Sequence, residues 1–234
     1  MDNLPSFRRF AAFSAIASFV LALASNMLQA LPLNFSSEVF TRPVVMLQVG
    51  TSGAGLLRWG MITDMLGYYL ALLPVALFLG HWCRSKDPLW VRFFTVCGVG
   101  YVLVGAIGAA VLAAVSPALI ASYAQASSQE RISVETIFET IWNFVYGGLW
   151  NILEVLLAGA WLLGIGLCLR VERRVFGVVT LILGISALLD ALGVILGIDA
   201  VAMLGLLIFV GLTPFWALWL GIDLLRRPAR IDTP

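Results

Sequence analysis

The sequence VRFFTVCGVGYVLVGAIGAAVLAAV, residues 91–115, decides the fold class, because it contains no charged residue after Arg92. About 20 apolar residues are enough to cross the hydrocarbon core of a bilayer as a helix. The rest of the chain has the same character: of 234 residues, 61% are hydrophobic and 12% are charged, and the mean hydropathy is +1.00. Soluble domains contain about 25% charged residues. The composition excludes a disordered chain, a nucleic-acid-binding domain and a small disulfide scaffold, and it predicts an integral membrane protein.

Five further apolar runs flank this stretch and predict a single all-α membrane domain, residues 1–234, with six transmembrane helices. The expected spans are residues 10–33, 59–80, 91–115, 148–169, 175–198 and 201–225. Polar residues predict two longer outer loops, at residues 34–58 and 116–136. Apolar character continues from residue 137 to 169, which is too long for one upright span. We therefore interpret residues 132–147 as an amphipathic approach helix that leads into the fourth span.

The first run can also be interpreted as a cleaved secretory signal. It follows Arg8 and Arg9, and Ala22-Leu23-Ala24 resembles a cleavage site. The run is long for the apolar core of a signal, and its length favours a retained span.

Lysine and arginine residues are distributed unequally between the two ends of the predicted spans. One side receives eleven of the fourteen: Arg8, Arg9, Arg84, Lys86, Arg92, Arg170, Arg173, Arg174, Arg226, Arg227 and Arg230. The other side receives Arg42, Arg58 and Arg131. Cytoplasmic loops of membrane proteins collect lysine and arginine. We therefore expect a multi-pass protein of the bacterial inner (plasma) membrane with both termini in the cytoplasm.

The spacing of the residues excludes the intramembrane enzyme motifs that the sequence contains. Residues 50–53, GTSG, match the GxSG pattern of six-span serine proteases, whose serine needs a histidine within hydrogen-bond distance. The only histidine, His81, lies at the other end of the second span, about 30 Å from Ser52. A lone histidine also excludes bis-histidine haem and HExxH zinc sites. The sequence predicts no catalytic residue, cofactor or metal site. The cysteines form no CxxC pair and are interpreted as free thiols: Cys83, Cys97 and Cys168.

Three acidic residues lie inside predicted spans, where a charge is costly unless it faces the bundle interior. Asp64, Glu154 and Asp190 belong to three different spans and to the outer half of the bilayer. The polar residues of the fourth segment fall within an arc of about 160° when they are plotted at about 100° per residue. They are Glu135, Glu139, Asn143, Tyr146, Trp150, Asn151 and Glu154. The pattern predicts an outward-facing polar pocket between spans two, four and five. Its expected ligand- or cation-binding residues are Asp64, Asn143, Asn151, Glu154 and Asp190.

The same residues could instead hydrogen-bond to one another and join the helices without any ligand. In that interpretation Glu154 is protonated or paired with Arg58. A single sequence is compatible with both roles.

Residues 91–115 also carry two rows of small residues, Gly105-Ala109-Ala113 and Ala106-Ala110-Ala114. Such rows let helices approach closely in lipid. Two functional hypotheses follow. The first is binding or transport of a small molecule or cation at the polar pocket. The alternative is a non-catalytic structural or regulatory subunit that contacts another membrane protein through this span. An intramembrane enzyme ranks below both.

Four features resemble a family of bacterial six-span membrane proteins known only as a domain of unknown function. They are the chain length, the long outer loop after the first span, the part of the second span from Tyr68 to Gly80, and the ending PFWALWLGIDLL at residues 214–225. The resemblance implies the six-span layout but no activity and no site residue. The chain also resembles the small substrate-capturing subunits of vitamin transporters in its size, its alanine-rich first helix (Ala11, Ala12 and Ala15) and its long loop. That likeness implies a loop that caps an outward pocket.

Overall fold

The computed structural model describes residues 4–40, 42–85 and 87–226, and within them every regular element is a helix. Six helical segments are long and apolar enough to cross a membrane: Leu4–Leu33, Pro43–Cys83, Pro88–Gln125, Ser128–Glu172, Arg174–Leu196 and Asp199–Arg226. The predicted all-α membrane bundle of six transmembrane helices is confirmed. Three of the cations in the charge tally, Lys86, Arg227 and Arg230, lie outside the described residues.

Two of the six segments are interrupted, and the other four are α-helical over most of their length. The uninterrupted helices are α1 (Leu4–Ala30), α4 (Pro88–Gln125), α7 (Arg174–Leu196) and α8 (Asp199–Arg226). Short 3₁₀ turns follow α1, namely η1 (Leu31–Leu33), η2 (Ser37–Phe40) and η3 (Pro43–Val49). The second segment consists of α2 (Gly50–Asp64), a π-helical stretch η4 (Met65–Tyr69), a 3₁₀ turn η5 (Leu70–Leu72) and α3 (Leu73–Cys83). The fourth consists of α5 (Ser128–Trp142), a π-helical stretch η6 (Asn143–Glu154) and α6 (Val155–Glu172).

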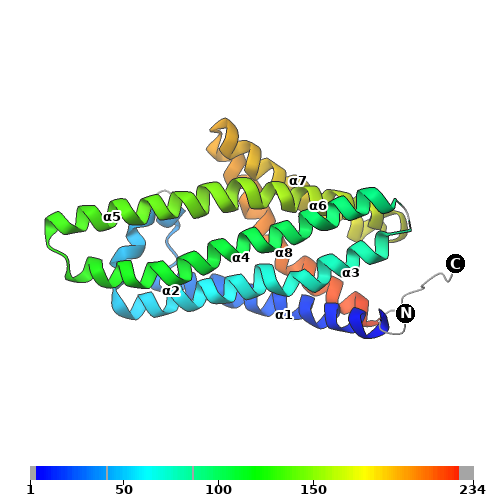
Figure 1. Cartoon of the computed structure of the whole chain (residues 1–234), viewed down its shortest axis with the longest axis horizontal. Helices are drawn as coiled ribbons and strands as arrows, with labels where there is room; N and C mark the ends of the chain where they lie inside the picture. The colour runs from blue at the N-terminus through cyan, green and yellow to red at the C-terminus, as the bar shows by residue number, and fades with distance from the viewer. Residues whose placement is uncertain (1–3, 41, 86, 227–234) are drawn as a thin grey trace.

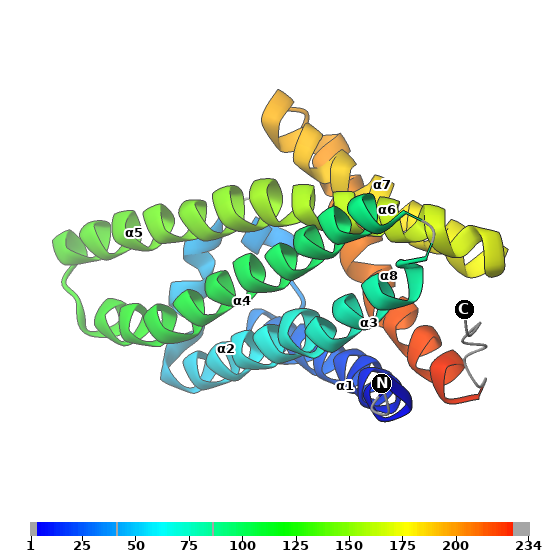
Figure 2. The same ribbon diagram turned by 45° about the vertical axis from the view of Figure 1, so that its right-hand side comes forward.

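The helices form a bundle in which the start of α1 and the end of α8 lie at one end and the turn between α4 and α5 at the other (Figure 1). Helix α1 packs against α2 and α8, α4 packs against α2 and α6, and α7 packs against α6 and α8. The tip of the α7–α8 hairpin points away from the other helices in both views (Figures 1 and 2). The interrupted segments therefore meet α1 and α4 inside the bundle.

The outer loop predicted at residues 116–136 is wrong, because this region is a helical hairpin. Helix α4 has 38 residues and continues through Pro117 to Gln125. At 1.5 Å per residue it is about 57 Å long, well beyond the hydrocarbon thickness of about 30 Å. Helix α5 then starts at a capping box in which Ser127 and Glu130 bond each other's backbone N–H groups. The expected approach helix is continuous with α6, and α2 begins at Gly50 inside the loop predicted at residues 34–58.

Two of the cysteines differ from their predicted state. Cys83, at the end of α3, and Cys168, in α6, form a disulfide with Cα atoms 6.1 Å apart. Cys97 is buried and free, as predicted. The pairing was not visible in the spacing because 85 residues separate the partners. It joins the two interrupted segments at the end of the bundle where the predicted cytoplasmic arginines gather.

The row Gly105-Ala109-Ala113 makes its close contact within the chain. All three residues are buried on α4, whereas Ala110 and Ala114 of the second row are exposed. Gly105 lies against the ring of Tyr69, where a Cβ atom would have no room. This face of α4 is therefore occupied by the chain's own second segment and is not available to a partner protein.

Replacement of Ala109 by leucine tests this packing. Ala109 is fully buried, so the larger side chain should overpack the contact and lower the free energy of unfolding by about 1–3 kcal/mol. The matched control is Ala110→Leu on the exposed face of the same helix, which should change it by less than about 0.5 kcal/mol. Unfolding in mixed micelles measures both. Equal stability of the two variants would show that the face of α4 that carries Ala109 is not closely packed against the rest of the chain.

Candidate functional site

The second segment breaks within its length, directly after Asp64. The π-helical stretch and the 3₁₀ turn replace eight residues of α-helix, and Tyr69 leaves the helical region with φ −120° and ψ −77°. Pro74 follows in the first turn of α3 and cannot donate a backbone hydrogen bond. Gly67 permits the close approach of α1, because a Cβ there would lie 2.6 Å from the backbone N of Ala22. Gly67 within the π-helical stretch and Pro74 after it thus both favour a break at this position.

Neighbouring side chains bond the carbonyl groups around this break. On α1, Ser18 Oγ donates to the Gly67 carbonyl at 2.6 Å and Ser14 Oγ to the Ala71 carbonyl at 2.7 Å. The Tyr101 hydroxyl of α4 donates to the Tyr68 carbonyl at 2.8 Å. An unsatisfied carbonyl in hydrocarbon costs several kcal/mol, so these bonds are what make a break at this depth tolerable.

The fourth segment carries the second irregularity, the 12-residue π-helical stretch η6. Glu154 is its last residue, as Asp64 is the residue directly before η4. Single π turns in α-helices occur frequently at functional sites. Both intramembrane acids of these two segments therefore stand at a boundary between α- and π-helix.

A cavity of about 470 Å³ lies between these irregular stretches. Its walls come from α1, the turns that follow α1, α2 with η4, α4, η6 and α8. Asn34 and Phe35 have positive φ angles of 51° and 59°, which turn the chain so that Phe35 and Ser36 close part of the cavity. Its polar lining residues are Asn26, Gln29, Ser36, Asp64, Asn151 and Glu154. The cavity is therefore mostly apolar with a few polar groups, which is the usual composition of a small-molecule site.

Only one of the two carboxylate oxygens of Asp64 has a hydrogen-bond partner among the described residues. Ser25 Oγ has one proton, which it shares between Asp64 Oδ1 at 3.3 Å and the nearer Gly60 carbonyl at 3.0 Å, and Gln29 Nε2 donates to Ser25 Oγ at 2.8 Å. Asp64 Oδ2 is buried and has no hydrogen-bond partner among the described residues. A buried carboxylate oxygen without a donor is costly, so Asp64 carries an unmet hydrogen-bonding demand at the edge of the cavity.

Glu154 is 4% exposed and accepts a hydrogen bond from the Tyr69 hydroxyl at 3.1 Å. The pairing with Arg58, considered in the sequence analysis, is not the one found, and Arg58 is exposed on α2. Glu154 also lies within electrostatic range of Asp64. The break in the second segment thus supplies both a neighbouring carboxylate and the hydroxyl donor for Glu154.

The structure brings together three of the five predicted site residues, Asp64, Asn151 and Glu154. Asn143 is exposed and does not line the cavity. Asp190 is fully buried behind the wall, within electrostatic range of Glu154, and neither carboxylate oxygen has a hydrogen-bond partner among the described residues.

The expected location between spans two, four and five also needs correction. The fifth span, α7, contributes no lining residue, whereas α1 and α8 do. The polar stripe was plotted with α-helical geometry, but residues 143–154 are π-helical. A π-helix has more residues per turn, so Asn143 rotates out of the line that leads to Glu154.

Residues of α1 and three tyrosines, Tyr68, Tyr69 and Tyr101, line the cavity but were not among the predicted site residues. Asn26 and Gln29 are polar residues three apart in an otherwise apolar run, which was a usable signal. The Asn26 amide donates to the Tyr68 hydroxyl at 3.1 Å, and that hydroxyl donates to the Val210 carbonyl of α8 at 3.1 Å. No spacing in the sequence indicates that Tyr68, Tyr69 and Tyr101 meet.

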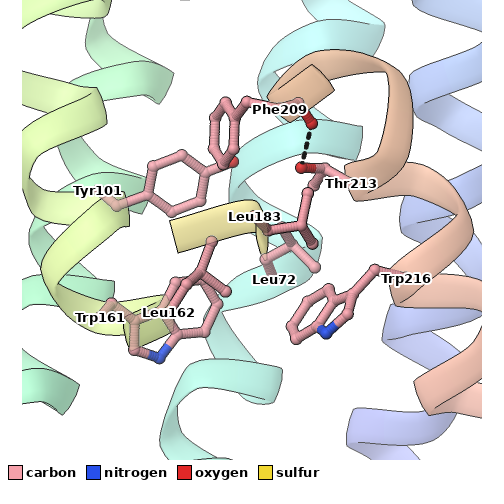
Figure 3. A pocket seen from close by; sticks show the side chains of 8 residues that line it. All are labelled: Leu72, Tyr101, Trp161, Leu162, Leu183, Phe209, Thr213 and Trp216. Carbon is pink, nitrogen blue, oxygen red and sulfur yellow. Dashed lines mark hydrogen bonds between the residues drawn. The ribbon is translucent and has the colours of Figure 1, made fainter. Parts of the chain in front are cut away.

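Packed rings close the cavity toward the other end of the bundle. Tyr101 and Phe209 line the cavity and also contact the cluster beneath it, which includes Trp161 and Trp216 (Figure 3). The space within this cluster is too small for a water molecule. These rings therefore close the cavity toward the end of the bundle that holds the start of α1 and the end of α8.

No family model, curated protein or solved structure matches this chain. The resemblances in layout given above therefore stay predictions, and the site is argued from its own geometry.

Removal of the Tyr69 hydroxyl tests the site's internal bonding. Tyr69→Phe should lower the free energy of unfolding by about 1–3 kcal/mol, because Glu154 loses its donor in a buried place. Tyr123→Phe is a matched control, since Tyr123 also donates to a glutamate, Glu135, at 2.8 Å but outside the cavity. The control should change stability by less than about 0.5 kcal/mol. Equal effects of the two changes in mixed-micelle unfolding would contradict the buried bond.

Proposed function

We propose that this protein binds a small molecule in the cavity between α1, α2, α4, η6 and α8, as a capture or transport protein of the membrane. The observation that carries the proposal is the cavity itself, with two buried acids at the ends of two helix irregularities. Its volume of about 470 Å³ lies in the range of known ligand sites, about 300–1,000 Å³. A purely structural hydrogen-bond network would bring the polar groups into contact and leave no such space.

The broken second segment supports the same function. Many transporters form their substrate sites near the bilayer midplane from discontinuous helices, whose freed backbone groups face the site. Here the break lies beside Asp64, and the packed rings of Tyr101 and Phe209 close the far side. A protein that takes up a ligand from one side needs such an arrangement.

The alternative function, a structural or regulatory subunit that binds its partner through span three, loses its main support. The small-residue row that suggested it contacts the chain's own second segment. The lipid-facing side of α4 carries large apolar residues such as Leu103 and Ile107, which are ordinary for a helix in lipid.

A cavity-filling substitution at Gly211 tests the proposed site. Gly211 of α8 lines the cavity, and an added Cβ there would meet nothing within 4 Å. Gly211→Leu should therefore fold normally but occupy ligand space. Compounds from a mixed library of cations, anions and neutral molecules that raise the melting temperature of the parent should lose this effect in the variant. At about 100 times Kd, a bound compound stabilises by about 2.7 kcal/mol.

The matched control is Gly55→Leu, on α2 outside the cavity, where an added Cβ is equally free of contacts. It should keep the response to every compound. Compounds that stabilise Gly211→Leu as well as the parent would bind elsewhere and would contradict the proposed site.

We also propose the orientation that the arginines indicate, with both termini in the cytoplasm and the cavity on the outer side of the inner membrane. A reporter fused after Arg227 should be cytoplasmic, and a tag in the turn at residues 126–127 should be external. Cys83 and Cys168 lie at the arginine-rich end, where a cytoplasmic location would keep thiols reduced. We therefore expect thiol labelling in intact cells to find these two cysteines reduced and to find the disulfide only after isolation. A periplasmic C-terminus, or the disulfide in intact cells, would reverse the orientation.

A further inference from the structure

We propose that the ligand of this cavity is a protonated organic amine, with its ammonium group at Asp64 and Glu154 and its apolar part against the aromatic wall. The inference rests on the proposed function and names the chemical class of the ligand. It is argued from the charges, the unpartnered oxygen and the aromatic residues of the lining.

The described lining residues include acidic side chains and no basic side chain. Asp64 and Glu154 are 91% and 96% buried, from exposed fractions of 9% and 4%. No arginine, lysine or histidine is among the described residues that line the cavity. Two neighbouring carboxylates in a low-dielectric site attract a cation and repel an anion. An anionic ligand is thereby disfavoured.

The hydrogen-bonding state of Asp64 favours a cation that carries N–H groups. Asp64 Oδ1 already accepts from Ser25, but Oδ2 is buried without a partner among the described residues. An ammonium N–H would complete this carboxylate with a charge-assisted bond, which is stronger than a bond between neutral groups. Glu154 keeps its bond from Tyr69 and adds a second carboxylate to the same site.

The aromatic residues supply the rest of the site. Trp142, Tyr146 and Trp150 form one continuous group, with ring centroids 5.1 Å and 6.4 Å apart. Tyr69 and Tyr101 also line the cavity. The Tyr69 hydroxyl donates a hydrogen bond to Glu154, and the Tyr101 hydroxyl donates one to the Tyr68 carbonyl. Tyr69 and Tyr101 are only 6% and 1% exposed, so the half-buried Tyr146 and Trp150 supply most of the ring surface that a ligand can reach. Aromatic rings attract cations and also bury apolar groups.

A metal ion fits this lining poorly. Calcium takes six to eight oxygen ligands, and magnesium keeps several waters in an octahedron. Over the described residues, no three His, Cys, Asp or Glu side chains are grouped as a metal site requires. An amine needs only one or two carboxylates, and its hydrocarbon part matches the apolar remainder of the cavity.

Three probes of nearly equal shape test the ligand class with the purified full chain. They are 2-phenylethylammonium, neutral 2-phenylethanol and anionic 3-phenylpropanoate, each titrated at pH 7.5. Tryptophan fluorescence and melting temperature report binding, since Trp142 and Trp150 line the cavity. We expect the ammonium probe to bind at least about tenfold more tightly than the alcohol, and the carboxylate not to bind.

Neutral variants of the acids complete the test. Asp64→Asn and Glu154→Gln should each weaken binding of the ammonium probe by about tenfold or more. Glu139→Gln is the matched control, because Glu139 is an exposed acid of the same segment outside the cavity. It should leave binding unchanged. The Asn and Gln variants keep the size of the parent side chains, and their melting temperatures show whether they are folded.

Several results would overturn the inference. If 2-phenylethanol bound as tightly as the ammonium probe and lost its binding in Gly211→Leu, the cavity would be a site for neutral molecules. The proposed function would then stand and the amine class would fail. Binding of the ammonium probe that survived Asp64→Asn and Glu154→Gln would also overturn the amine site. If no probe bound, the amine class would fail, and the library experiment with Gly211→Leu would decide the proposed function independently.

Discussion

Hydrogen bonding at the break between α2 and α3 is the constraint on which the rest of this structure depends. A membrane helix cannot open its backbone in hydrocarbon unless other groups bond to its freed carbonyls. Ser14 and Ser18 of α1 and Tyr101 of α4 supply those bonds. Because they do, the chain can leave α-helical geometry beside Asp64 and can place the Tyr68 and Tyr69 side chains in the bundle interior.

The two ends of the bundle differ in helix geometry. At the end with the termini, a disulfide joins α3 to α6. At the other end, two π-helical stretches occur in neighbouring segments, and the cavity lies between them. The wider turns of a π-helix project side chains along lines that an α-helical neighbour does not match. The cavity therefore follows from irregular helix geometry, whereas glycines allow close helix contacts at both ends of the bundle, including Gly67 and Gly105 beside the cavity.

The buried acids give the cavity its chemical character. Carboxylates at this depth are unfavourable in lipid, yet Asp64, Glu154 and Asp190 occupy three neighbouring segments. Ser25 and Tyr69 stabilise only part of this set, because the remaining oxygens of Asp64 and Asp190 have no partner in the described chain. Protonation or a bound cation would remove the imbalance. Because the cavity is lined by two of these acids, Asp64 and Glu154, there is space beside them for a bound cation.

The sequence alone determined the features that depend on composition and length. Long apolar runs gave six spans, because about 20 apolar residues suffice to cross a bilayer wherever they occur. Polar residues inside those runs identified Asp64, Asn151 and Glu154 as neighbours of one pocket, because a polar residue in lipid must face the interior. The hairpin of α4 and α5 was missed, because polar surface residues resemble a loop once a helix leaves the membrane.

Only the tertiary structure decided which helices enclose the cavity and which residues face it. Asn143 was misplaced because residues 143–154 are π-helical and a periodicity plot assumes α-helical geometry throughout. Asp190 was misplaced because its helix, α7, packs against α6 and α8 and forms no wall of the cavity. The contacts of Tyr69 with Glu154 and of Cys83 with Cys168 join residues 85 apart in both cases. Pairings over such separations are set by how the helices pack, and no local pattern in the sequence records them.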